Sequence, residues 1–438
     1  MEIDQTSYND LSIFHHEEEY SIFHKLNLAQ TAEGKEWLHK FFKSPFSDAK
    51  LISETQAIIK LILSKMDQWP TSITNGTIMV MTKFFDTGID SLPTRSDYIS
   101  AYSYKIFHGP DFALIRYSLS HFSDFLRGMQ LMVEILDNEE APPTLKRFLL
   151  RARDLMDKPL ANELAAREKG HEFSITDTIY YGKFIKYEYK HQVFELINIF
   201  GRLDAWYAMA AAHKKYNLSF PIIHEGRQPF IHAKGLFHVL IPGAVPYDVE
   251  MNIESNFIFL TGANMAGKST FIKAVGCSVF LAHVGMGVPA KEFNLTVFDG
   301  LLSNINVADN IAKGESYFFN EVQRIRNTIL KINDGRKWLV LIDELFKGTN
   351  VQDAMKCSST VIKGLIKITS SLFILSTHLY EIGDELKGYR NISFKYFETD
   401  VREDQLEFSY QLKDGVSNDR IGYIILKREK VVDMLEKL

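Results

Sequence analysis

Hydrophobic positions follow two different patterns in the two halves of the chain. From the start to about residue 220, apolar residues recur every three or four positions, as over 35–51. This spacing is typical of amphipathic helices, and it predicts long helices over 111–136, before Pro142 and Pro143, and over 194–216. Residues 1–220 are therefore predicted to form an all-α domain. Helices of this length suggest levers, although an ordinary helical domain fits the pattern equally well.

The second half contains short, continuous apolar runs with helical patterns between them. The runs cover 256–260, 337–342 and 371–375, and polar or turn residues flank each of them. Uninterrupted apolar strands that alternate with helices indicate a parallel sheet covered on both faces. Residues 221–438 are therefore predicted to be an α/β domain, and the whole chain to combine an α/β with an all-α domain.

Composition narrows the class of protein. The 438 residues are 46% hydrophobic and 13% aromatic, which excludes a disordered chain. The formal net charge of −5 excludes a uniformly basic coat for nucleic acid but leaves room for a local basic face. Two cysteines are too few for a disulfide framework. The chain begins without a signal-peptide pattern and has no apolar run of about 18 residues, so we expect a cytoplasmic protein without membrane contact.

The first apolar run leads into a glycine-rich loop, Thr261-Gly-Ala-Asn-Met-Ala-Gly-Lys-Ser-Thr270. Its spacing matches a P-loop, and it lies between a predicted strand and a predicted helix, as that motif requires. The glycines let backbone N–H groups face phosphates, Lys268 would reach the β- and γ-phosphates, and the Ser269 hydroxyl would bind Mg²⁺. The residues predicted to bind nucleotide here are Gly262, Ala263, Asn264, Met265, Ala266, Gly267, Lys268, Ser269 and Thr270.

Two further strand ends supply polar groups. The second run ends in Asp343 and Glu344, and the third is followed by His378. Asp343 is predicted to hold Mg²⁺, Glu344 to polarise the attacking water, and His378 to sense the γ-phosphate. A structural ion pair and a structural histidine are the alternatives. A P-loop also fits kinases and GTPases, but the adjacent carboxylates favour a Mg²⁺-dependent ATPase.

At this point the motifs resemble those of the MutS DNA mismatch repair family. TGANMAGKST resembles the family's TGPNMGGKST loop, LIDELFKGTNVQDA its DELGRGTS segment, and STHLYEI its ATHYFEL. Weaker similarity covers the first half, where the opening resembles the start of the family's core and lever domain. Further matching segments are 285–290, 309–321, 414–422, 11–14, 31–34 and 43–46.

The resemblance implies an ABC-type P-loop ATPase domain behind a helical core and lever domain. It also implies a homodimer with composite ATP sites, in which Lys268, Glu344 and His378 are catalytic. Residues 309–321 match the loop that reaches the partner's nucleotide in the family, which assigns Ser316 and its neighbour Glu315 to that role. Without the resemblance, an ordinary surface loop would be the simpler interpretation.

The sequence also departs from the family pattern. It begins where the core domain begins, so the mismatch-reading and connector domains are expected to be absent and the clamp reduced or missing. In the phosphate loop, Ala263 and Ala266 replace Pro and Gly without removing a side-chain ligand. The family usually has an aromatic residue for stacking on adenine where this chain has Ala244, and Tyr247 is the nearest ring that could replace it.

Basic residues in the first half are candidates for contact with double-stranded DNA. Lys183, Lys186 and Lys190 have the i, i+3, i+7 spacing of one helix face, among several tyrosines. Arg147 and Arg151 belong to a second cluster. A solvated helix face beside a core stripe is the alternative.

Two classes of function follow. The first is a MutS-type DNA-binding ATPase that opens and closes helical levers on DNA, mismatched or branched, in mismatch repair or DNA-structure processing. The second is an ATP-sensing scaffold that recruits a repair partner and has little DNA-structure specificity of its own. A small-molecule kinase is disfavoured because nothing resembles an acceptor pocket.

Overall fold

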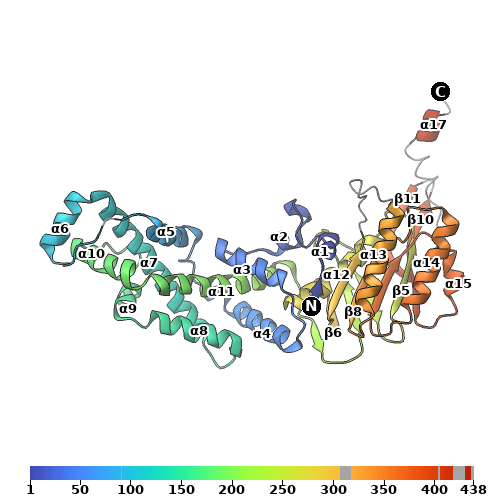
Figure 1. Cartoon of the computed structure of the whole chain (residues 1–438), viewed down its shortest axis with the longest axis horizontal. Helices are drawn as coiled ribbons and strands as arrows, with labels where there is room; N and C mark the ends of the chain where they lie inside the picture. Colours follow the sequence, from blue (N-terminus) through green and yellow to red (C-terminus); the bar gives the residue numbers. More distant parts are fainter. Residues whose placement is uncertain (90, 306–316, 403–404, 418–429, 436–438) are drawn as a thin grey trace. The chain divides into compact units, whose positions relative to one another are not determined.

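The computed structural model describes residues 1–89, 91–305, 317–402, 405–417 and 430–435. The chain divides into two compact units. Unit 1 comprises Met1–Lys25, Ser44–Ser53 and Lys215–Leu438, and unit 2 comprises Leu26–Lys43 and Glu54–Lys214. Figure 1 shows the elements of both units.

A mainly parallel sheet forms the centre of unit 1. In the described part of the chain it has seven strands in the order β1-β7-β8-β9-β5-β10-β11, and only the last pair is antiparallel. The three predicted apolar runs are confirmed as the adjacent central strands β8, β9 and β5. The bounds are β1 (Glu2–Ile3), β7 (Gly300–Asn304), β8 (Trp338–Asp343), β9 (Leu372–Ser376), β5 (Phe257–Gly262), β10 (Ile392–Arg402) and β11 (Gln405–Asp414).

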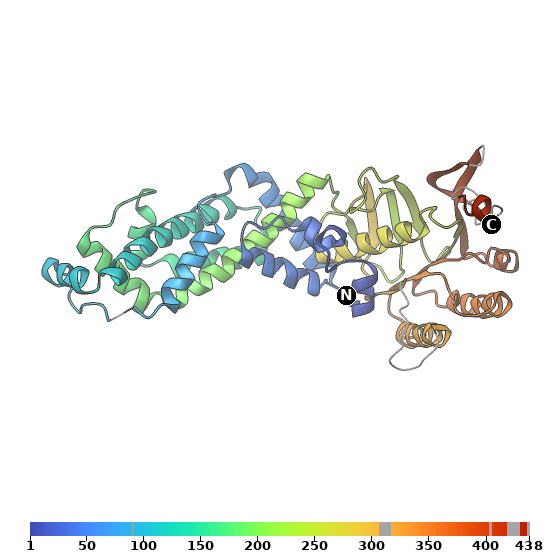
Figure 2. The same cartoon turned by 90° about the horizontal axis from the view of Figure 1, so that it is seen from above.

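Helices cover both faces of this sheet, as the continuous apolar strands predict (Figure 2). On one face, Val340 and Ile342 of β8 share a core cluster with α13 (Tyr317–Ile332), α14 (Val351–Leu365) and α15 (Ile382–Leu386). On the other face lies α12 (Lys268–Val284). It packs so closely that a Cβ added at Gly276 would lie 2.5 Å from Cδ1 of Leu341. The short helix α17 (Val431–Leu435) also belongs to unit 1.

A second, four-stranded sheet belongs to unit 1 and has the order β2-β6-β3-β4. The β2–β6 pair is parallel, and the other pairs are antiparallel. Its strands are short, and the sequence reading did not identify them. The bounds are β2 (Ile222–His224), β6 (Glu292–Thr296), β3 (Ile231–Leu236) and β4 (Tyr247–Met251).

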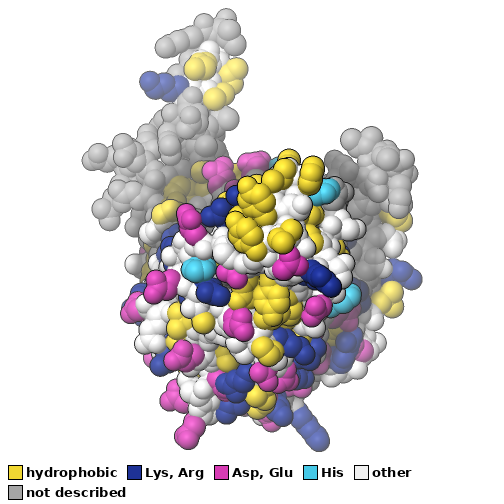
Figure 3. Space-filling view, turned by 90° about the vertical axis from the view of Figure 1, so that its left-hand side faces the viewer, with side chains coloured by type: hydrophobic (Ala, Val, Ile, Leu, Met, Phe, Trp, Pro, Cys, Tyr) yellow, Lys and Arg dark blue, Asp and Glu magenta, His cyan; other side chains and the backbone are white. Residues whose placement is uncertain are grey.

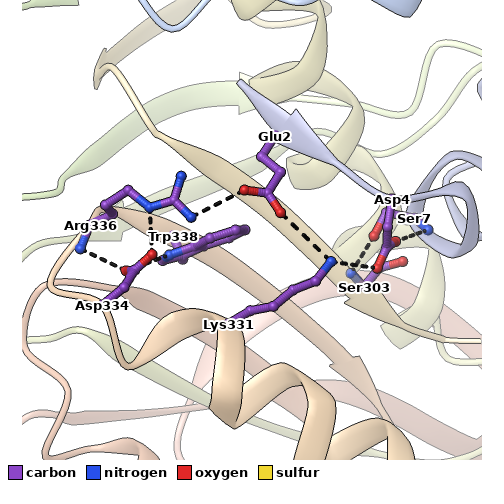
Figure 4. A network of polar contacts seen from close by, with 8 residues as sticks. All are labelled: Glu2, Asp4, Ser7, Ser303, Lys331, Asp334, Arg336 and Trp338. Atoms are coloured by element: carbon purple, nitrogen blue, oxygen red, sulfur yellow. Dashed lines mark hydrogen bonds and ion pairs between the residues drawn. The ribbon is translucent and has the colours of Figure 1, made fainter.

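The first residues of the chain pack with unit 1, which differs from the predicted division at residue 220. β1 pairs with β7, and α1 (Gln5–Asp10) lies against the same strand. η1 (Glu18–Tyr20) and α2 (Ile22–Leu26) follow α1 in the chain. Lys331 of α13 contacts Glu2 and Asp4 at 3.8 and 3.5 Å, and Arg336 contacts Glu2 at 3.1 Å (Figure 4). Helical spacing alone does not reveal which core a segment joins, so the sequence did not predict this placement.

Unit 2 is helical, as predicted. The expected helices over 111–136 and 194–216 are confirmed within α7 (Gly109–Leu136) and α11 (Lys190–Tyr216), whose phenylalanines Phe125 and Phe200 meet edge to face with ring centroids 6.1 Å apart. The other bounds are α3 (Ala32–Lys43), α4 (Ala49–Lys65), which begins in unit 1, η2 (Met66–Gln68), α5 (Asn75–Asp86), α6 (Tyr98–Phe107), α8 (Pro143–Met156), α9 (Pro159–Ala166), α10 (Ile175–Lys183) and the π-helical turn η3 (Phe184–Glu188).

One end of unit 2 carries exposed hydrophobic side chains. Figure 3 looks onto this end, where α6 lies, and shows hydrophobic groups gathered on it. The side chains of Ile99 and Phe107 are 80% and 79% exposed, and the rings of Tyr98 and Tyr102 stack with their centroids 5.8 Å apart. An apolar surface of this kind is unusual for a helix that faces solvent.

Candidate functional site

The glycine-rich loop joins β5 to α12 at the carboxyl ends of the parallel strands. Its backbone adopts positive φ angles at Gly262 (139°), Met265 (67°) and Gly267 (110°). A Cβ at Gly262 would lie 3.2 Å from the carbonyl oxygen of Phe397, so glycine is required there by both space and conformation. The loop therefore turns sharply into the N-terminus of α12, where free N–H groups favour an anion.

Lys268, the first residue of α12, is folded back into the loop. Its side chain is buried, and its ammonium group donates hydrogen bonds to the carbonyl oxygens of Gly262 (2.8 Å) and Ala263 (2.9 Å). Burial lowers the pKa of Lys268, and the nearby carboxylates of Glu344 and Asp343 partly oppose this shift. A partly desolvated cation thus lies at the mouth of the loop.

Asp343 connects β8, β9 and α12 at the carboxyl ends of the parallel strands. Ser269 of α12 donates a hydrogen bond of 2.5 Å to one carboxylate oxygen of Asp343, and Ser376 of β9 donates to the other. Asp343 and Ser376 are register partners in the β8–β9 pair. Hydroxyl and carboxylate oxygens are ligands that Mg²⁺ accepts. The predicted metal-binding pair, Ser269 and Asp343, is therefore brought together.

Glu344 follows Asp343 and points toward two basic side chains. It forms ion pairs with His378 and, at 2.5 Å, with Lys347, and its backbone has a positive φ of 60°. Burial raises the pKa of Glu344, but hydrogen bonds and charge interactions with His378 and Lys347 outweigh this effect and lower it to about 2. Glu344 is therefore ionised over the physiological pH range.

A cavity of about 490 Å³ opens beside the loop. Most of the predicted loop residues line it, as do Ala244, Tyr247 and Glu344, while Ala266 is buried beneath the surface. The loop residues on its wall are Ala263, Asn264, Met265, Gly267, Lys268, Ser269 and Thr270.

Two tyrosines contribute to the cavity in different ways. Tyr247 is only 4% exposed, and its ring packs edge-on against Phe271 and Phe397. Tyr410 of β11 also lines the cavity and is 41% exposed. The sequence reading missed Tyr410, because β11 lies far along the chain and only its pairing with β10 brings the ring to the loop. The aromatic alternation of Phe408 and Tyr410 was the available signal.

The three candidate DNA-binding lysines do not lie on one continuous α-helix. α10 ends at Lys183, the π-helical turn over 184–188 follows, and α11 begins at Lys190, so the assumed i, i+3, i+7 spacing of a continuous α-helix does not apply. The ammonium groups of Lys183 and Lys186 donate hydrogen bonds to the carbonyl oxygens of Thr94 (2.6 Å) and Ile89 (2.7 Å).

The remaining candidate basic residues differ in their partners. Lys190 is exposed and lies over the ring of Phe194, and Arg147 is exposed beside Phe148. Arg151 instead makes a two-point contact with Glu195, at 2.6 and 2.8 Å. Glu315 and Ser316, assigned to the partner's site by resemblance, lie outside the described residues.

The fold and the site define a mixed α/β domain that carries a glycine-rich loop and two carboxylates at the carboxyl edge of a mainly parallel sheet. Residues 258–434 match the family model of MutS domain V. This region of the chain is therefore similar to MutS domain V.

The chain is also similar to curated proteins that are named DNA mismatch repair protein MutS. The chain is 30% identical to the DNA mismatch repair protein MutS of Persephonella marina over 54% of this chain and 27% of that protein. It is 29% identical to MutS of Thermotoga maritima over 56% of this chain and 31% of the relative, and 26% identical to MutS of Lactococcus lactis over 53% and 28%. The match thus spans less than a third of each of these relatives.

Within the described part of the chain, no helix combines the length and apolar character that a membrane crossing requires.

Proposed function

We propose that the chain binds Mg²⁺ and ATP at the glycine-rich loop and hydrolyses ATP as an ABC-type P-loop ATPase. The observation that carries this proposal is the convergence of Lys268, Ser269, Asp343 and Glu344 on one end of the sheet. The donor set fits a nucleotide, because it combines a cation, helix N–H groups, a hydroxyl and a carboxylate.

Each polar group has a task in this proposal. Lys268 exchanges its two loop carbonyl partners for phosphate oxygens, and the N-terminus of α12 stabilises the same negative charge. Ser269 and Asp343 would hold Mg²⁺, which neutralises charge that develops on the phosphates. Their hydrogen bond already aligns the two oxygens.

Glu344 orients the attacking water. Its neighbours His378 and Lys347 lower the pKa of Glu344, so its carboxylate is ionised, and we infer that it aligns and polarises the attacking water. His378 and Lys347 fix the carboxylate from two sides. His378 is 37% exposed beside Glu344, which suits a side chain that contacts a phosphate group bound next to that carboxylate.

Tyr410 replaces Tyr247 as our candidate for contact with the nucleobase. The Tyr247 ring is enclosed by Phe271 and Phe397, whereas that of Tyr410 is accessible at the cavity wall. Aromatic stacking on a base is worth about 1–3 kcal/mol. The accessible ring is the one that can contribute it.

We further propose that the protein acts on double-stranded DNA as a homodimer of the MutS type. ATP would strengthen the dimer through composite sites, with Glu315 and Ser316 contacting the partner's nucleotide, and hydrolysis would release it. Movement of the helical unit would then be coupled to contact with mismatched or branched DNA. The MutS relatives and the site geometry support this proposal.

The test measures ATP hydrolysis by the full chain with and without duplex, mismatched and junction DNA. We expect Mg²⁺-dependent turnover that at least one DNA structure stimulates. If none of the DNA structures changes the rate of ATP hydrolysis, the result would favour the second function, an ATP-sensing scaffold that recruits a repair partner. Absence of both nucleotide binding and turnover would refute the proposal.

A further inference from the structure

The segment that carries Glu344 has an unfavourable backbone conformation. Glu344 and Phe346 both have φ angles of 60°, in the left-handed region. Side chains with a Cβ adopt this region at an energetic cost, so the conformation persists only where surrounding contacts hold it. On the strand side, the N–H of Glu344 donates to the carbonyl oxygen of Ser376 at 3.1 Å.

The other side of this segment is held by the first turns of α13. The carboxylate of Glu321 is only 3% exposed and accepts hydrogen bonds from the N–H groups of Lys347 and Gly348, both at 3.3 Å. One turn earlier, the Phe318 ring packs on the buried ring of Phe346, with centroids 5.6 Å apart.

A carboxylate suits this position for a physical reason. Two N–H groups from consecutive residues converge on it, and each finds its own oxygen. An apolar residue would leave both donors without this acceptor, and an amide would offer one acceptor and one donor. Burial raises the pKa of Glu321, while the N–H groups of Gly348 and Lys347 favour the ionised form.

We propose that Glu321 is a positioning residue for ATP hydrolysis: its carboxylate fixes residues 346–348, and thereby sets the direction of the Glu344 side chain. This inference rests on the proposed function, because Glu344 must orient water for its position to matter. It ties the geometry of Glu344 to α13, so a displacement of that helix changes the orientation of the water-polarising carboxylate.

The first experiment needs no nucleotide. Amide hydrogen exchange over 345–349 is compared in the wild-type chain, Glu321→Ala, Glu321→Gln and the matched α13 surface variant Asn327→Ala. Loss of one hydrogen bond is worth about 1 kcal/mol, so we expect exchange roughly five- to tenfold faster in Glu321→Ala, an intermediate rate in Glu321→Gln and no change in Asn327→Ala. Unchanged exchange in Glu321→Ala would overturn the proposal.

The second experiment measures turnover and ATP affinity separately. We expect Glu321→Ala to lower kcat at least about tenfold while the Kd for ATP stays within about twofold, because the phosphate loop is untouched. In the Glu344→Gln background the same substitution should cause no further loss. If Glu321→Ala lowers kcat by the same factor in the wild-type chain and in Glu344→Gln, Glu321 does not act by positioning Glu344. If wild-type protein lacks turnover while the exchange result holds, the proposed function fails but the structural role of Glu321 stands.

Discussion

The hydroxyl of Ser269 lies 2.5 Å from a carboxylate oxygen of Asp343, although the two residues belong to different halves of the α/β unit's sequence. Ser269 is the second residue of α12, and Asp343 is the last residue of β8. The strand that precedes α12 is β5, and β8 lies two places from it in the sheet. The strand order β8-β9-β5 therefore sets this distance. It also leaves Ser376 of β9 between them as a second donor to Asp343.

Removing either member of this pair should impair the use of Mg²⁺. We expect Ser269→Ala and Asp343→Asn to lower Mg²⁺-dependent ATP hydrolysis at least about 100-fold, because roughly 3 kcal/mol of charge stabilisation is lost. Phosphate release over a Mg²⁺ titration measures this effect. Ser278→Ala, a buried serine on the same helix, is the control. Wild-type Mg²⁺ dependence in Ser269→Ala would exclude this pair as the metal site.

Glu344→Gln should separate binding from hydrolysis. Its side chain keeps the shape of glutamate but loses the charge that orients water, so we expect kcat to fall by about 10²–10⁴-fold while ATP still binds. Light scattering of this variant with ATP and Mg²⁺ then tests the dimer. A species that remains monomeric under saturating ATP would contradict the proposed composite sites.

Tyr410 should matter more than Tyr247 for nucleotide affinity. Removing the accessible ring in Tyr410→Ala is expected to raise the Kd for ATP by about tenfold, since roughly 1–3 kcal/mol of base stacking is lost. Tyr247→Leu removes the enclosed ring and should raise the Kd less than Tyr410→Ala does. Calorimetric titration measures both, and the reverse ranking would restore Tyr247 as the base contact.

The candidate DNA contacts can be ranked by the salt dependence of binding. We expect Arg147→Ala and Lys190→Ala to reduce the slope of log K against log salt by about one each, because an exposed cation that contacts phosphate releases counterions. Lys183→Ala and Lys186→Ala should leave the slope unchanged, since both ammonium groups bond to backbone carbonyls. If only Lys183→Ala and Lys186→Ala reduce the salt dependence of binding, these two lysines, and not Arg147 and Lys190, contact DNA.

His283 should make the protein less stable in mild acid. Its ring is fully buried: Nδ1 donates to the carbonyl oxygen of Val279 at 2.8 Å, and Nε2 accepts from the N–H of Phe298 at 2.9 Å, which requires the neutral form. Burial lowers the pKa of His283 to about 4. The unfolded chain, with the ordinary pKa near 6.5, binds the proton first, so stability is lost as pH falls from about 6.5 toward 4.

Protonation of His283 in the unfolded chain is expected to account for about 2 kcal/mol of the stability that the protein loses between pH 7 and pH 5. His283→Gln should be less stable than wild type at pH 7, because the hydrogen bonds at the site change, but should lose about 2 kcal/mol less on acidification. Urea unfolding at both pH values measures this difference. His238, with a pKa also lowered to about 4 by burial, contributes equally to both proteins and so cancels. Identical acid losses would show that His283 does not titrate as proposed.

The sequence determined the features that depend on neighbours along the chain. Continuous apolar runs are enough to predict β5, β8 and β9, because strands buried on both faces need apolar residues throughout. The three-to-four-residue period predicted α7 and α11. The glycine loop follows from its own spacing and from the strand before it, so its residues could be named without a tertiary structure.

Tertiary structure decided the features that depend on partners distant in sequence. The β10–β11 pairing brings Tyr410 to the loop, β1 joins the sheet of the second half, and Glu321 reaches two N–H groups that follow Glu344. The π-helical turn interrupts the continuous α-helix that the lysine spacing assumed. The physical reason is common to all of them: hydrophobic and hydrogen-bonding patterns fix which side of an element is buried, but the pairing of elements in space fixes what lies against it.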